Sequence, residues 1–176
     1  MNTLAVLITL LGVAMATPAT AQPRRVDPNA RQILAYRLTG DSLRRVDLVM
    51  RDMDRASDRS EAPRSDVAMI GVLSGAWAYG SSWRDSTADA AVRTIETGHS
   101  ELTRAIRSAG MTTRDYVLAL MNLMLAHPTA STSRQGRGVT TTDVASANVA
   151  WVEANWYDVD RFMRDLQQRI DNPRRR

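Results

Sequence analysis

The sequence predicts an all-α protein, folded as an irregular antiparallel bundle of five or six helices. Apolar residues recur every three or four positions through several long stretches, which is the period of a helix that buries one face. Residues that cap helices stand before these stretches, and Pro or Gly follows several of them. Sustained alternation of apolar and polar residues, which would indicate strands, is absent.

The chain opens with "LAVLITLLGVAMA", an uncharged and mostly apolar run that Pro18 and then "ATA" follow. This order predicts a secretory signal peptide over residues 1–21. The run is shorter than the roughly 20 apolar residues of a membrane-spanning helix. We therefore expect export to the periplasm or the cell exterior, and one helical domain over residues 22–176 with no transmembrane span. An uncleaved N-terminal anchor is the alternative, because no Arg or Lys precedes the run.

All 23 basic residues are Arg, and the chain contains no Cys. Disulfides, thiolate metal sites and Cys nucleophiles are therefore excluded. Residues 26–173 hold 18 of the arginines against all 19 acids, so the positive charge belongs to the two ends, including a basic tail at 172–176. Nucleic acid binding needs a clustered basic surface, and we expect no nucleic acid partner.

The first helix is expected over residues 27–38, because Asp27 is a good cap and Pro28 suits the first helical position. Thr39 is then expected to cap a second helix, whose buried stripe consists of Leu43, Val46, Met50 and Met53. Pairs of Asp and Arg one turn apart, such as Asp47 and Arg51, indicate its solvent-exposed face.

The middle of the chain begins with a polar segment, residues 54–65, that we expect to be a flexible loop. Residues 66–80 are nearly continuously apolar but contain three glycines, which favours a buried helix, with a pair of short strands as the alternative. Ser86 is expected to begin the next helix, and Ser100 the one after it. Gly110 is expected to end that helix in the left-handed conformation.

The segment "AGMTTRDYVLALMNLMLAH" predicts a central helix over residues 112–127, capped by Thr112 and Asp115. Its apolar face is wider than the seam of a coiled coil, which indicates burial on more than one side. Pro128 is expected to stop this helix. Residues 128–142, rich in Ser, Thr and Gly, are expected to form a flexible linker.

The last helix is expected within residues 143–171. Its apolar residues follow strict spacings of three and four: Val149, Val152, Trp156, Val159, Met163, Leu166 and Ile170. Two ion pairs, Asp160 with Arg164 and Asp165 with Arg169, are expected on its outer face. Such a helix gains its stability by docking its stripe against the rest of the bundle.

Parts of the sequence resemble a family of small exported, all-helical bacterial proteins without an assigned activity. The family combines an Ala-Gly-[Leu/Met]-Thr-x-Arg-[Asp/Glu]-Tyr turn, which leads into an apolar helix, with an Asn-[Val/Ile]-x-[Phe/Trp]-Val segment. The matching residues here are Ala109, Gly110, Met111, Thr112, Arg114, Asp115, Tyr116, Asn148, Val149, Trp151 and Val152. "LTGDSLRRV" at residues 38–46 fits the family's first helix. The resemblance implies export and a helical fold, and it implies no reaction.

Candidate chemistry is sparse. The only two histidines, His99 and His127, lack metal-ligand spacing, and a protonated His127 would suit the carbonyl end of its helix. No nucleophile motif accompanies them. We therefore expect no metal, no cofactor and no enzymatic activity.

One polar set within the resembling motifs is a candidate site for a ligand or partner: Arg114, Tyr116, Asn148, Trp151 and Asn155. A structural reading competes with it, in which Tyr116 is buried with a hydrogen-bonded hydroxyl and Asn148 ties the linker to a helix end. The favoured hypothesis is a non-enzymatic, exported binding module of a chaperone-like or partner-binding kind. The alternative is a carrier of a small ligand, with its pocket between the helices at 113–127 and 143–171.

Overall fold

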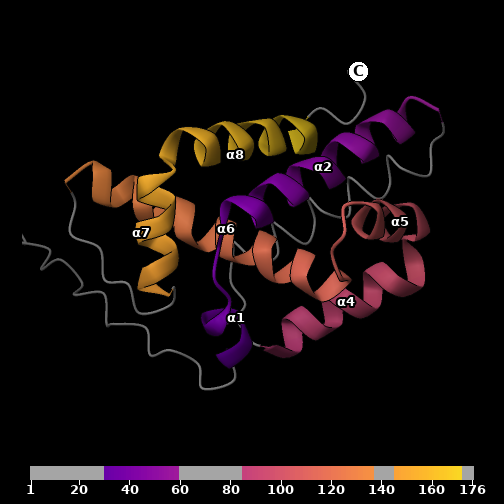
Figure 1. Cartoon of the computed structure of the whole chain (residues 1–176), viewed down its shortest axis with the longest axis horizontal. Helices are drawn as coiled ribbons and strands as arrows, with labels where there is room; N and C mark the ends of the chain where they lie inside the picture. The colour runs from indigo at the N-terminus through magenta and orange to yellow at the C-terminus, as the bar shows by residue number, and fades with distance from the viewer. Residues whose placement is uncertain (1–29, 60–84, 137–144, 172–176) are drawn as a thin grey trace, which may run out of the picture.

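The computed structural model describes residues 30–59, 85–136 and 145–171, which form seven helices and no strand. The all-α fold expected from the sequence is thereby confirmed (Figure 1). The helices are α1 (Arg31–Ala35), α2 (Gly40–Ser57), α4 (Asp85–Gly98), α5 (Ser100–Ser108), α6 (Thr113–Arg134), α7 (Ser146–Ala154) and α8 (Trp156–Asp171). The expected signal peptide, the helix or strand pair at 66–80 and the basic tail lie outside the described residues.

Helix α6 runs through the middle of the bundle, with α2 and α8 along one side and α1 and α4 along the other (Figure 1). Six consecutive residues, 118–123, are buried, so this part of α6 is covered all round. The central position expected for it is confirmed. Its closest neighbours are α7 and α4, and α2 packs closely on α5.

The predicted caps form as expected at three helix ends. The Thr39 side chain accepts a hydrogen bond from the Ser42 backbone N–H, and the Ser42 hydroxyl accepts one from the Thr39 N–H. Thr112 caps α6 through the Asp115 N–H at 3.0 Å. Gly110 ends α5 with a φ of +72°, the left-handed conformation in which Gly has no steric penalty.

Helix α6 does not stop at Pro128 as predicted; it continues to Arg134. Pro removes one backbone hydrogen bond and crowds the preceding turn, at a cost of about 3 kcal/mol in a helix interior. Ala126 and Ala130 on either side are fully buried, so this turn is held by packing. The Thr132 hydroxyl also donates a hydrogen bond back to the Pro128 carbonyl at 2.9 Å. Helix α2 likewise extends to Ser57, into the stretch predicted as a loop.

The expected last helix is divided in two at Asn155, whose backbone (φ −113°, ψ 27°) leaves the helical region. The predicted stripe is therefore divided between two helices, both of which contact α6. Val149 and Val152 are buried on α7, while Val159 and Leu166 are buried on α8. Phe162, which the spacing left off the stripe, is buried at 5 % exposure.

Candidate functional site

The five residues proposed from the sequence do not form one site. Arg114, Tyr116 and Asn148 hold the fold together. Trp151 and Asn155 line a groove between α2 and the pair α7 and α8. Structural contacts account for Arg114 and Asn148, and Asn148 ties the α1–α2 connection rather than the linker to α7. A binding role for Trp151 and Asn155 stays a prediction.

Asn148 is the centre of a buried polar network that joins distant segments. Its side-chain oxygen accepts a hydrogen bond from the Leu38 N–H at 3.0 Å, and its amide donates to the Tyr36 carbonyl at 3.0 Å and to the Asn122 side-chain oxygen at 2.6 Å. The Asn122 amide in turn donates to the Ile33 carbonyl at 3.1 Å. Both side chains are 1 % exposed. The two asparagines thus fasten the connection between α1 and α2 to α6 and α7.

Arg114 and Tyr116 leave the first turns of α6 in different directions. The Arg114 guanidinium forms an ion pair with Asp89 of α4 and a hydrogen bond with Gln32 of α1. Tyr116 is 1 % exposed, and burial raises the pKa of its hydroxyl well above the usual value, although the nearby Arg169 charge opposes that shift. The hydrogen bond expected for this hydroxyl is not formed within the described residues.

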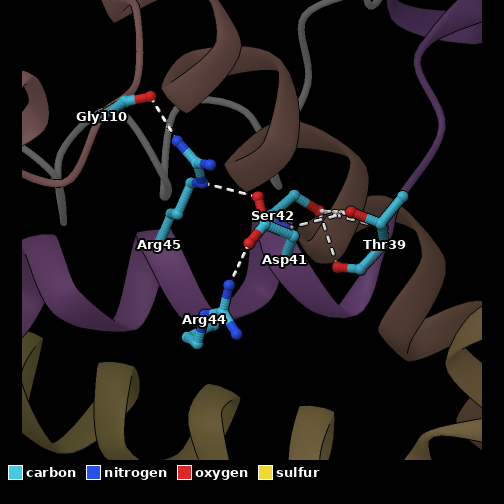
Figure 2. Close-up of polar contacts among 6 residues, drawn as sticks. All are labelled: Thr39, Asp41, Ser42, Arg44, Arg45 and Gly110. Atoms are coloured by element: carbon cyan, nitrogen blue, oxygen red, sulfur yellow. Dashed lines mark hydrogen bonds and ion pairs between the residues drawn. The ribbon is translucent and has the colours of Figure 1, made fainter.

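Arg45 joins α2 to the turn between α5 and α6 (Figure 2). Its guanidinium donates to the Gly110 carbonyl and, through Nε, to an Asp41 carboxylate oxygen at 2.6 Å. The hydrogen bond from Arg45 is the main reason that the pKa of Asp41 lies below its usual value. A Cβ atom at position 110 would lie 2.7 Å from the Arg45 Nη1 atom. Gly110 is therefore needed for its backbone conformation, and a Cβ there would also require the end of the Arg45 side chain to shift.

The three segments that carry the sequence motifs, residues 38–46, 109–116 and 148–152, meet through these contacts. Leu38 of the first segment bonds to Asn148 of the third, and Arg45 of the first bonds to Gly110 of the second. These contacts give a structural reason for the residue types in the motifs.

The groove between α2 and the α7–α8 pair has a volume of about 260 Å³. Its apolar surface comes from Leu43, Trp151 and Phe162. The remaining lining residues are Gly40, Arg44, Asp47, Arg51, Asn155, Asp158, Arg161 and Asp165. Figure 2 shows how α2 serves two purposes, because Arg45 reaches the Gly110 turn while Arg44 leaves the helix on a different side, toward α8.

Charges of both signs alternate along the two walls, and most are paired within their own helix. Arg51 contacts Asp47 at 2.6 Å on α2, and Arg161 contacts Asp158 at 3.6 Å on α8. Arg44 pairs with Asp41. The groove thus combines three apolar side chains with charged residues of no net sign, and polar atoms make up most of its surface.

Asp165 does not form the pair predicted for it. Arg169 turns instead to Asp54 near the end of α2, at 2.9 Å, where the Arg169 side chain is only 11 % exposed. A half-enclosed position between two helices gives the guanidinium a stronger partner than an exposed carboxylate on its own helix. Within the described residues, Asp165 is left without an ion-pair partner on the wall of the groove.

Helix α6 is longer than predicted, so His127 lies in its interior. The expectation that His127 stands at the carbonyl end of its helix is therefore wrong. Its ring stacks on Trp156 with 4.9 Å between ring centres and 7° between planes, and its Nε2 lies 3.2 Å from an Asp160 oxygen. The Arg134 guanidinium lies 5.1 Å from the centre of the same indole. This cluster fastens the second half of α6 to the start of α8. Across the residues that the structure covers, no three metal-binding side chains come together.

Sequence reasoning missed Phe162 and Leu43 as parts of the groove, and Asn122 as the partner of Asn148. Asn122 carries a local signal, since it is a polar residue within the apolar run "LALMNLML". Position 162 also carries a signal, because Phe162 lies three residues after Val159 and four before Leu166, the spacing of one helix face.

Comparison with family models, curated proteins and solved structures finds no match for this chain. Within the described residues, no helix combines the length and the apolar character that crossing a membrane requires. The fold and the groove together define an all-α protein with a small, mostly polar surface groove that includes three apolar side chains.

Proposed function

We propose that this chain is an exported, non-enzymatic interaction module that holds an apolar side chain of a polypeptide in the groove between α2 and α8. The observation that carries the proposal is a group of three apolar side chains, Leu43, Trp151 and Phe162, among lining charges of alternating sign. Aromatic anchors surrounded by polar rims are typical of protein–protein contacts. The signal-like N-terminus supports export.

The volume of the groove favours a side chain over a whole cofactor. Sites for drug-sized ligands usually measure about 300 to 1,000 Å³, whereas this groove measures about 260 Å³. It has room for one or two large side chains. A polypeptide can fill it with one residue and extend beyond it over the walls.

The charges of the walls also favour a polypeptide. A phosphate-rich ligand would be expected to meet a cluster of arginines alone, but each Arg here has a carboxylate close by on its own helix. A polypeptide backbone carries both donors and acceptors, so walls of both signs can hydrogen-bond to it.

The small-ligand alternative placed its pocket between the helices at 113–127 and 143–171. Helix α7 packs closely on α6 there, and the Asn122–Asn148 hydrogen bond lies between them. The groove lies instead on the α2 side of α7 and α8. A stoichiometric small molecule in the native mass spectrum of the protein purified from its host would favour this alternative.

The test fills the groove without disturbing the core. Gly40 lines the groove, and a Cβ atom there would meet no atom within 4 Å, so Gly40→Trp introduces a large side chain from the rim. Gly98→Trp is the matched control, because position 98 is equally open and lies at the end of α4, away from the groove.

Binding of a fluorescently labelled unfolded polypeptide is measured by anisotropy for the wild type and both variants. We expect Gly40→Trp to weaken binding by at least about tenfold and Gly98→Trp to leave it unchanged. Equal binding by all three proteins, or no binding by the wild type, would remove the basis of the proposal.

A further inference from the structure

Two large apolar side chains are exposed in the described part of the chain, and both belong to helices that form the groove. Leu48 on α2 is 41 % exposed, and Tyr157 on α8 is 74 % exposed. Tyr157 immediately precedes Asp158 of the groove wall and lies one turn before Arg161, whose guanidinium is 6.0 Å from the phenol ring. A prominent aromatic side chain therefore lies next to a groove whose lining includes two aromatic residues, Trp151 and Phe162.

We propose that the polypeptide bound by the groove is a second copy of this chain, and that Tyr157 of each copy enters the groove of the other. This inference rests on the proposed function of the groove. An isologous dimer requires a surface that is its own complement. A projecting side chain beside a groove on one face meets that requirement, because a two-fold axis between them forms both contacts at once.

The size and chemistry of Tyr157 fit the groove. A phenol ring is smaller than the available volume of about 260 Å³, and Trp151 and Phe162 offer it aromatic contacts. Asp165, which has no ion-pair partner within the described residues, lies on the groove wall as an acceptor for the Tyr157 hydroxyl. The Tyr157 ring would thus be buried against apolar side chains, and its hydroxyl would donate a hydrogen bond to Asp165.

The charges around the contact do not oppose association of two copies. The groove walls contribute three arginines, at 44, 51 and 161, and three aspartates, at 47, 158 and 165. The body of the chain is also nearly balanced, with 18 arginines and 19 acids between residues 26 and 173. Like-charge repulsion, which keeps many proteins apart, is therefore weak on this face.

The oligomeric state is measured by sedimentation velocity over a range of protein concentrations. We expect a reversible monomer–dimer equilibrium in the wild type. Tyr157→Ser is expected to weaken dimerisation by at least about tenfold, because buried aromatic anchors dominate such contacts. Leu48→Ser is the control, since it removes the other exposed apolar side chain without altering the groove, and it is expected to leave the equilibrium unchanged.

Gly40→Trp tests the groove side of the same contact and should weaken dimerisation as strongly as Tyr157→Ser. A wild type that is monomeric at every concentration overturns the inference, and so does a dimer that survives both variants. The polypeptide-binding assay separates this outcome from failure of the proposed function. If the wild type is a monomer that binds unfolded polypeptide, and Gly40→Trp abolishes that binding, the proposed function of the groove stands. Only the inference that a second copy is the partner then fails.

Discussion

The two sides of α2 show how differently one helix can be used. On the side of the α5–α6 turn, Arg45 makes its contacts to a backbone carbonyl and to Asp41, and Val46 beside it is fully buried. On the side of α8, Arg44 and Arg51 are mostly exposed and pair only within α2. Contacts between distant segments hold the fold on the first side, whereas on the second side the groove lies open beside the Asp54–Arg169 ion pair that joins the end of α2 to α8. The difference separates the residues that stability needs from those that are free to bind a partner.

The largest expected loss on the stabilising side follows from Asn148→Leu. The Leu38 N–H, the Tyr36 carbonyl and the Asn122 side chain would each lose a buried hydrogen bond. Because buried polar groups without partners cost about 1–3 kcal/mol each and such costs are not additive, we expect a loss of about 3 kcal/mol in the free energy of unfolding. Urea denaturation followed by circular dichroism measures it.

Asn155→Ala is the comparison for that variant, because Asn155 lines the groove and its amide bonds only to Trp151 in its own turn. Its cost is expected to stay below about 1 kcal/mol. Equal losses for the two asparagines would contradict the separation of the two regions.

Gly110→Ala is expected to cost about 2 kcal/mol, from the left-handed backbone and from the approach of its Cβ to Arg45. In an Arg45→Ala background the steric part disappears, so the same substitution should cost only about 1 kcal/mol. A double-mutant cycle in thermal unfolding measures the coupling. Strictly additive effects would show that Arg45 does not need Gly at this position.

Tyr116→Phe is expected to change stability near neutral pH by no more than about 1 kcal/mol, since the buried hydroxyl has no hydrogen-bond partner in the described residues. Burial raises the pKa of Tyr116 in the folded protein, so the native state favours the neutral phenol. The contribution of the neutral phenol to the free energy of unfolding is complete below about pH 10, the pKa of Tyr in the unfolded chain. It is lost as the pH rises further. Alkaline unfolding should therefore begin at higher pH in Tyr116→Phe than in the wild type. If both proteins unfold at the same alkaline pH, another group is responsible. Tyr36 is an example, because burial also raises its pKa.

The smallest expected effect belongs to the groove wall. Arg51 is 60 % exposed and pairs with Asp47 within one helix, so Arg51→Ala should cost less than about 0.5 kcal/mol of stability. Chemical denaturation checks this value. A loss of several times that size would show that the wall supports the fold as the opposite side of α2 does.

The features that sequence alone predicted are those set by neighbouring residues. Thr39, Thr112 and Gly110 act at helix ends through contacts within a few positions, and the wide apolar face of α6 follows directly from its composition. For the same reason the all-α class could be predicted without any relative for comparison.

The features that sequence missed depend on contacts between distant segments. Pro128 stays inside α6 because buried alanines on both sides hold the turn. Arg169 leaves Asp165 for a carboxylate 115 positions away. The groove exists only because α7 and α8 separate at Asn155 and pass beside α2. Spacing along one helix carries no information about these partners.

The Leu38–Asn148 hydrogen bond spans 110 positions of the chain, which has a consequence for the order of events after synthesis. A chain that emerges from its N-terminus exposes Leu38 and Tyr36 long before Asn148 exists to bond with them. The junction between α1 and α2 thus becomes fixed only when the final third of the protein arrives, and contacts of such long range slow folding.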